Sequence, residues 1–274
     1  MPITNARKNS LYRWLVILVA VLILSVSHFV SHSVLASDVA SSPFAGTKVR
    51  LASLDWPPYT GENLPGKGKS TIISRQAFAV NNIGMTTVFY PWRRVLDSLN
   101  SDQSLIGYYP EYKSASLENR FYFSDSIGDS PLGFVSLAGS TFDWTVPDDL
   151  KKWRIGVVAG YVNEPTFDRM MKNGDLKTLA ANDDVTLLRL LHAKRIDAAV
   201  MDAQVLQYWL RTLPEFSALS GDFAFHPHLL GTKTLHVVFR KTEQGRQLRD
   251  LFNYGLQNQG SNLISAQQER LLSQ

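Results

Sequence analysis

Two apolar segments of the sequence each end in residues that can contact a ligand. The first, Ile155 to Val158, leads into a loop with Gly160, and the second, Ala198 to Met201, is followed by Asp202. In an open α/β sheet, the loops at the carboxyl ends of the strands present the ligand-contacting groups. We therefore expect the glycine loop and the carboxylate to line one binding crevice.

Aromatic side chains also occur where strands are expected to end. Tyr59, Tyr108 and Tyr161 follow apolar segments, and Trp56 precedes two prolines that stop a strand and force a turn. Rings at these places can pack on the apolar part of a ligand or over a cation. The alternative for each ring is packing in the core. For Trp92, at the start of an amphipathic helix, core packing is the preferred interpretation.

Strand and helix patterns alternate along the chain and would position these side chains. Regular alternation implies an α/β fold with a mainly parallel sheet and right-handed crossovers. The alternation alone also allows a single large doubly wound domain. The expected strands are 48–54, 87–90, 104–108, 121–124, 132–137, 154–158, 176–179, 196–201 and 235–240, and the expected helices are 71–81, 91–99, 164–173, 183–193, 203–212 and 242–257.

The N-terminus has the pattern of a secretory signal peptide. Basic residues up to Arg13 precede the apolar run Trp14 to Val26, and Ala36 ends a plausible processing site. An uncleaved anchor is the alternative, but the central run is short for a spanning helix, which needs roughly 20 residues. We expect residues 1–36 to be removed, residues 37–47 to be flexible, and the mature protein to reside in the periplasm.

Charge and cysteine content exclude several function classes. The chain has 28 Lys and Arg against 24 Asp and Glu, and the expected leader contains only basic charges, so the mature chain is close to neutral. Nucleic-acid binding needs a clustered excess of cations and is not expected. Cysteine is absent, which excludes disulfides, thiol catalysis and Cys-based metal sites. The histidines have no ligand spacing beyond His226-Pro227-His228, so we expect no metal and no cofactor.

Five sequence blocks together resemble the family 3 bacterial extracellular solute-binding proteins, the periplasmic receptors for polar amino acids that serve as substrate-binding domains of ABC transporters. The blocks are Trp56 to Gly61, Phe121 to Asp125, Asp148 to Gly160, Arg195 to Asp202 and Val237 to Lys241. The resemblance implies a two-lobed clamshell of the type II periplasmic-binding-protein fold, in which each lobe is a mainly parallel sheet flanked by helices.

The resemblance also implies how the chain is divided between the lobes. Lobe 1 would comprise residues 48–129 and 235–274, and lobe 2 would comprise residues 130–234. Family members place an aromatic and a hydrogen-bonding residue at the loops that hold Tyr59 and Tyr161. The position of Asp202 matches an aspartate that binds the α-amino group of the ligand. The alternative for Asp202 is a cap for the helix 203–212, and both roles are compatible.

The sequence departs from the family at the carboxylate-binding position. Family members usually place an arginine six residues before the phenylalanine of the Phe-Ser motif, and counting back from Phe123 gives Leu117. This puts ordinary recognition of an α-carboxylate in doubt. Arg120 is the first candidate to replace the missing arginine. Further candidates are Arg93, Arg94 and Lys113.

The expected function is binding of a small polar solute, most simply an amino acid or analogue, by a monomer that closes its lobes and delivers the ligand to an ABC permease. A receptor that presents its ligand to a membrane sensor would look the same in sequence. Some proteins of this fold are dehydratases that use cleft carboxylates as general acids. Asp202, Glu164 and Asp55 are the residues available for such chemistry, but no catalytic motif is present.

Overall fold

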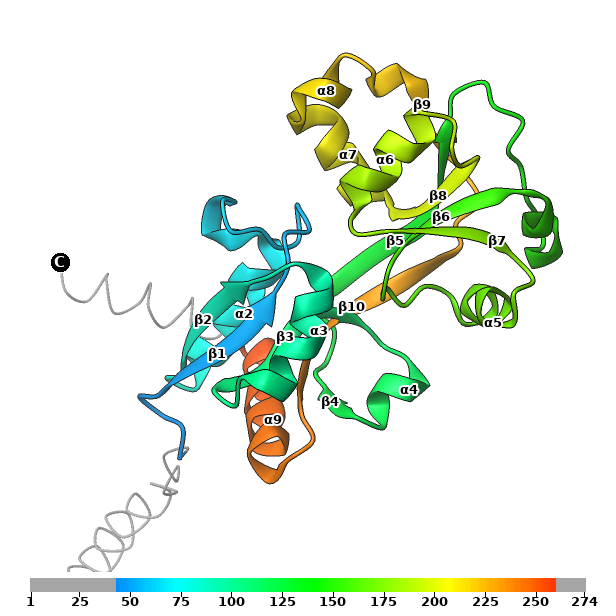
Figure 1. Ribbon diagram of the computed structural model, residues 1–274. Helices are drawn as coiled ribbons and strands as arrows, with labels where there is room; N and C mark the ends of the chain where they lie inside the picture. Colours follow the sequence, from blue (N-terminus) through cyan, green and yellow to red (C-terminus); the bar gives the residue numbers. More distant parts are fainter. Residues whose placement is uncertain (1–42, 260–274) are drawn as a thin grey trace, which may run out of the picture. The chain divides into compact units, whose positions relative to one another are not determined.

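The protein is built on one mixed sheet of ten strands, in a computed structural model that describes residues 43–259 (Figure 1). The order is β2-β1-β3-β10-β5-β8-β6-β7, with β4 also paired to β10 and β9 to β5. The strands are β1 (Lys48–Ser53), β2 (Gly84–Phe89), β3 (Leu105–Tyr112), β4 (Phe121–Phe123), β5 (Gly128–Leu137), β6 (Arg154–Val158), β7 (Lys177–Ala181), β8 (Ala198–Asp202), β9 (Phe223–Phe225) and β10 (Gly231–Arg240).

Helices connect the parallel strands and cover the sheet. The α-helices are α2 (Lys69–Val80), α3 (Trp92–Ser101), α4 (Ala115–Glu118), α5 (Pro165–Asn173), α6 (Asp184–His192), α7 (Ala203–Thr212), α8 (Pro214–Ser217) and α9 (Glu243–Gln257). Short 3₁₀ helices are η1 (Pro65–Lys67), η2 (Pro147–Lys152) and η3 (Ser220–Asp222). None of the helices within the described part of the chain is long and apolar enough to cross a membrane. The expected signal peptide lies outside the described residues.

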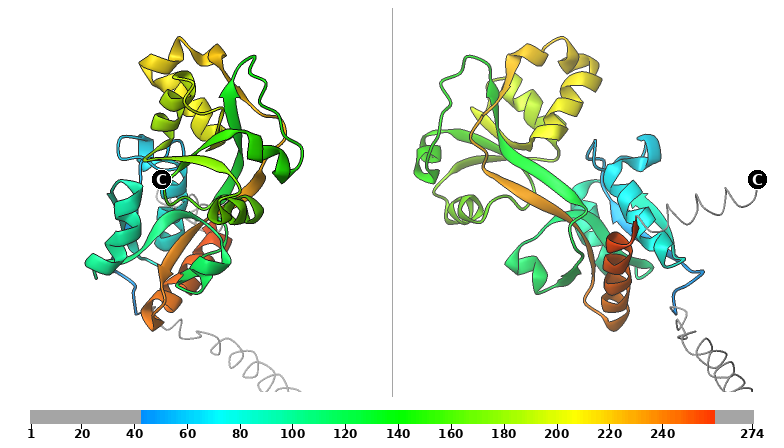
Figure 2. Two further views of the ribbon diagram at one scale, coloured as in Figure 1. Left: turned by 45° about the vertical axis from the view of Figure 1, so that its right-hand side comes forward. Right: turned by 180° about the vertical axis from the view of Figure 1, so that it is seen from behind.

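The sheet consists of two parallel groups joined by two long antiparallel strands. β1 pairs in parallel with β2 and β3, and β6 pairs in parallel with β7 and β8. β5 and β10 pair with each other from Gly231 opposite Leu132 to Leu235 opposite Gly128. Both views in Figure 2 show these two strands running side by side from one group to the other. The predicted lobe boundaries fall inside β5 and β10 and stay a prediction.

Local sequence signals explain where several helices begin. A side chain just before the helix accepts a backbone N–H of its first turn, which satisfies a donor that would otherwise have no partner. The capping residues are Glu164 for α5, Asp183 for α6, Asp202 for α7 and Thr242 for α9. The helix predicted over residues 203–212 and the strand predicted over 154–158 have the observed bounds.

Four strands extend well beyond an expected bound. β3 ends at Tyr112, four residues after its expected end, and β2 begins at Gly84, three residues before its expected start. β5 begins at Gly128 and β10 at Gly231, four residues before each expected start. The first four residues of β5 and of β10 are glycine, proline or polar residues. They therefore lack the alternation of apolar and polar residues that indicates a strand. They become strands because they pair with each other, a contact between distant parts of the sequence. The short elements α4, α8 and β9 contain too few residues to show a period.

Candidate functional site

A small cavity lies beyond the carboxyl ends of β1 and β6, beside β3. Its volume is about 30 Å³, which is room for about two water molecules. Its lining residues are Leu54, Trp56, Trp92, Pro110, Glu111, Tyr112, Tyr161, Val162 and Leu235. A wider hollow of about 440 Å³ lies between the loop 137–142 and residues around Arg154, and none of the predicted site residues lines it.

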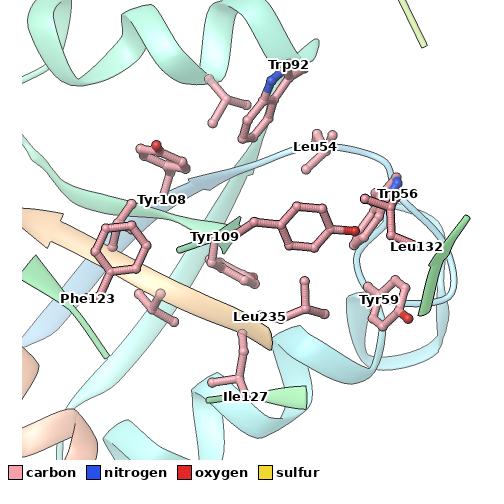
Figure 3. Packing of buried hydrophobic residues seen from close by; sticks show 14 of the residues in the cluster. Leu54, Trp56, Tyr59, Trp92, Tyr108, Tyr109, Phe123, Ile127, Leu132 and Leu235 are labelled. Carbon is pink, nitrogen blue, oxygen red and sulfur yellow. The ribbon is translucent and has the colours of Figure 1, made fainter. Parts of the chain in front are cut away.

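Aromatic rings at steep angles to one another form the walls of this cavity. The ring of Tyr161 lies 6.4 Å from that of Trp56 at 84° and 5.6 Å from that of Trp92 at 87°. Tyr112 meets Trp56 at 6.1 Å and 75°, and Tyr59 stacks on Trp56 at 4.5 Å. Figure 3 shows Trp56 and Tyr59 together beyond Leu54, with Trp92 on the neighbouring helix. Trp92 is therefore both a core residue, as interpreted from the sequence, and part of the cavity wall.

Asp202 is buried and caps α7. Its Oδ1 accepts the backbone N–H groups of Gln204 at 2.6 Å and Val205 at 2.9 Å. Its Oδ2 accepts the hydroxyl of Tyr59 at 2.9 Å and that of Ser130. The helix-cap alternative is thus observed. Because these four hydrogen bonds fill the acceptor positions of the carboxylate, a ligand ammonium reaches Asp202 only by replacing a hydroxyl. Burial raises the pKa of Asp202.

Two further buried carboxylates lie beside the aromatic rings, and both were missed by the sequence analysis. Glu111 lines the cavity, accepts the hydroxyl of Tyr108 at 2.9 Å and the backbone N–H of Tyr112 at 2.7 Å. Asp184 accepts the hydroxyl of Tyr161 at 3.3 Å. Burial raises the pKa of each carboxyl to about 7. An acidic residue inside the apolar strand pattern of residues 105–112 was the available signal for Glu111.

The three tyrosines predicted for the site share one role in the structure, although only Tyr161 lines the cavity. Tyr108, expected in a strand-end loop, lies inside β3, because that strand continues to Tyr112. Each of the three tyrosines donates its hydroxyl to a different buried carboxylate. The pairs are Tyr59 with Asp202, Tyr108 with Glu111, and Tyr161 with Asp184. Within residues 43–259, no ion pair joins any of these three carboxylates to a basic side chain.

The predicted cation is not at the cavity. Arg120 is exposed, and its guanidinium lies 5.2 Å from the centre of the Phe121 ring. Leu117, at the position of the family arginine, packs against the core. Two lysines lie over tyrosine rings of this region. The ammonium of Lys69 is 4.2 Å from the centre of the Tyr59 ring, and that of Lys233 is 5.6 Å from the centre of the Tyr112 ring. Burial lowers the pKa of both lysines, and neither lines the cavity.

The residues considered for catalysis are not brought together. Asp55 is exposed and accepts the backbone N–H of Glu62, while Glu164 caps α5 through the backbone N–H of Phe167. Neither lines the cavity. Asp202 is connected to it through Ser130, whose hydroxyl contacts that of the lining residue Tyr112. The described residues contain no group of three or more His, Asp or Glu side chains that could hold a metal ion.

Comparison with known structures identifies the fold. Holo arginine-binding protein from T. maritima has 18% sequence identity and a TM-score of 0.63, with 78% of this chain and 90% of that chain covered. The GluR0 ligand-binding core from Nostoc punctiforme, in complex with L-glutamate, has 21% identity and a TM-score of 0.62, with 78% and 93% covered. A histidine kinase sensor domain with similarity to periplasmic binding proteins has 15% identity and a TM-score of 0.67, with 81% and 95% covered.

The chain has the periplasmic-binding-protein fold. No protein-family model matches it, and a search of curated proteins finds no match. β5 and β10 connect the two parallel groups of strands, which correspond to the predicted lobes. The cavity lies between the two groups, because Trp56 and Trp92 follow strands of the first group and Tyr161 follows β6 of the second.

Proposed function

We propose that this protein binds a small polar solute, an amino acid or close analogue, in the cavity between its two lobes. One observation supports the proposal most strongly: Trp56 and Trp92 from one lobe contact Tyr161 from the other at a cavity that is also lined by a carboxylate. A ligand that contacts both lobes only when they are closed stabilises the closed form by its differential affinity.

The proposed contacts follow from the positions of the side chains. Trp56 and Tyr161 provide apolar faces, and Tyr59 and Asp202 join the lobes beside the cavity. Tyr108 is a positioning residue that acts through Glu111. Arg120 does not line the cavity but interacts electrostatically with Tyr108, which donates to Glu111. A direct contact of Arg120 with the ligand would require a rearrangement of the segment around α4.

We propose binding without catalysis, in the periplasm, by a monomer that supplies an ABC permease. Asp55 and Glu164 lie away from the cavity, which argues against a dehydratase that uses these two carboxylates, because a general acid must lie within hydrogen-bond reach of the reacting group. The structural similarity to a histidine kinase sensor domain supports a second candidate function, in which a membrane sensor recognises the ligand-bound protein.

A thermal-shift screen of the mature protein against amino acids, their amides and small amines tests the proposal. A ligand of the folded state raises the melting temperature by an amount that grows with the logarithm of its concentration above Kd, so at least one compound should raise it in a dose-dependent way. Trp56→Ala should abolish that shift. Tyr254→Ala, at an exposed position on α9, should keep it. The proposal fails if no compound shifts the wild type, or if both variants respond as the wild type does.

A further inference from the structure

We infer that the ligand of this site is an organic ammonium ion without a carboxylate, and that Glu111 binds its ammonium group. The inference rests on the proposed function and deepens it by naming the class of ligand. Three features support it: the charge of the cavity lining, the hydrogen bonding of Glu111, and the aromatic walls.

The charge around the cavity favours a cation and opposes an anion. Glu111 is the acidic residue in the lining. Asp184 and Asp202 are buried outside the lining and accept the hydroxyls of Tyr161 and Tyr59. All three accept hydrogen bonds from neutral hydroxyls, and none forms an ion pair with a described basic side chain. A buried charge without an opposite charge is costly, so a ligand cation would lower the free energy of this arrangement.

Lys233 interacts electrostatically with Glu111 only from outside the lining. Its ammonium lies over the Tyr112 ring outside the lining, and it interacts electrostatically with Asp168 and Glu164 as well as with Glu111. A ligand carboxylate inside the cavity would meet Glu111 at close range with no cation in the lining to offset the repulsion.

Glu111 can accept more hydrogen bonds than the protein gives it. A carboxylate has about four acceptor positions, and Glu111 uses two of them, for the hydroxyl of Tyr108 and the backbone N–H of Tyr112. Asp202, by contrast, has four partners. Among the three buried carboxylates, Glu111 therefore combines a place in the lining with free acceptor positions.

The aromatic walls of the cavity favour a small organic cation. Rings of Trp56, Trp92 and Tyr161 meet nearly at right angles, and aromatic faces attract ammonium groups. The indole N–H groups of Trp56 and Trp92 are buried without an acceptor, a costly state that a neutral oxygen of the ligand can relieve. A hydroxyl or amide oxygen fits this need without adding negative charge.

Matched triples of compounds test the inference. Each triple contains an amino acid, its amide and its decarboxylated amine: glycine, glycinamide and methylamine; serine, serinamide and ethanolamine; arginine, argininamide and agmatine. In calorimetric titrations of the mature protein, we expect the amide or the amine of at least one triple to bind at least about tenfold more tightly than the acid, which corresponds to about 1.4 kcal/mol.

The outcomes separate this inference from the proposed function. Binding of an amino acid at least as tightly as its amide and amine would overturn the inference and leave the proposed function standing. If no member of any triple binds, the inference fails, and the thermal-shift screen against the remaining compounds decides the proposed function.

A pair of variants tests whether Glu111 binds the ammonium group of the ligand. Glu111→Gln keeps the shape of the side chain and removes its charge, and it should weaken amine or amide binding at least tenfold. Glu62→Gln, a matched change at an exposed position, should leave binding unchanged. Asp184→Asn serves as a second variant if Glu111→Gln does not melt cooperatively. Unchanged amine affinity in a folded Glu111→Gln protein would overturn the assignment.

Discussion

Three tyrosine hydroxyls each donate a hydrogen bond to a different buried carboxylate. Sequence analysis placed Tyr59, Tyr108 and Tyr161 at the site because aromatic residues at strand ends are typical of ligand-binding loops. It missed Glu111 and Asp184, because the environment of an acidic residue depends on contacts with distant segments. Glu111, for example, is opposite His236 in the neighbouring strand β10. Of the aromatic residues predicted for the site, Trp56 and Tyr161 line the cavity, whereas Tyr59 and Tyr108 do not. The carboxylate in the lining became visible only in the fold.

The buried carboxyls should make the folded state less stable as the pH rises. Glu111 and Asp184 have pKa values near 7 in the folded protein, above their usual 4.5 and 3.8. The folded state therefore holds more protons than the unfolded state between those values. Their stabilising contribution is fully present below the unfolded pKa values and is lost as the pH rises through about 7. Between pH 6.5 and 8.5, we expect urea unfolding to show a loss on the order of 1 kcal/mol.

A double variant provides the control for this pH dependence. Glu111→Gln with Asp184→Asn should unfold with a much flatter dependence on pH over the same range. The groups facing Glu111 include Tyr108, Lys233 and His236; burial lowers the pKa of His236, so its effect is confined to lower pH. An identical pH dependence in wild type and double variant would refute the assignment of the titration to these carboxyls.

Among the elements, the sequence predicted best those whose signals are local. The helix over 203–212 has an Asp cap and an amphipathic period, and the strand over 154–158 is a short apolar run, so both were placed correctly. The first residues of β5 and β10 were missed because they are strands only through pairing with each other. The same long-range pairing joins the lobes, so the connection between them was the least predictable part of the sheet from local pattern alone.

The packing of α9 on α2 gives a test at this scale. Gly255 of α9 lies so close to α2 that an added Cβ would be 1.9 Å from the carbonyl oxygen of Ala77. Alanine favours helix by about 1 kcal/mol over glycine, but the clash should dominate. We expect Gly255→Ala to lower the free energy of unfolding by about 1–3 kcal/mol in urea titrations. Gly221→Ala, which has open space around its Cβ, should change it little, and equal stability of both variants would contradict the packing.

For the whole molecule, the central claim is that a small solute binds between the lobes and contacts both. Contacts already present between the two groups of strands include the hydroxyl of Tyr59 on Asp202, the ammonium of Lys69 on Gln204, and the ring of Tyr161 on those of Trp56 and Trp92. In the structure described here, the cavity is about 30 Å³, so any ligand larger than about two waters must widen it. Binding should therefore change the separation of the walls without changing the fold of either lobe.

A diffraction structure of the mature protein with serinamide or ethanolamine, whichever binds more tightly, tests this claim most directly. We predict density for the ligand between Trp56 and Trp92 of one lobe and Tyr161 of the other, with its ammonium about 3 Å from the Glu111 carboxylate. A ligand that saturates the protein in solution but occupies the outer face of a single lobe in the crystal, with the cavity walls unmoved, would contradict the account.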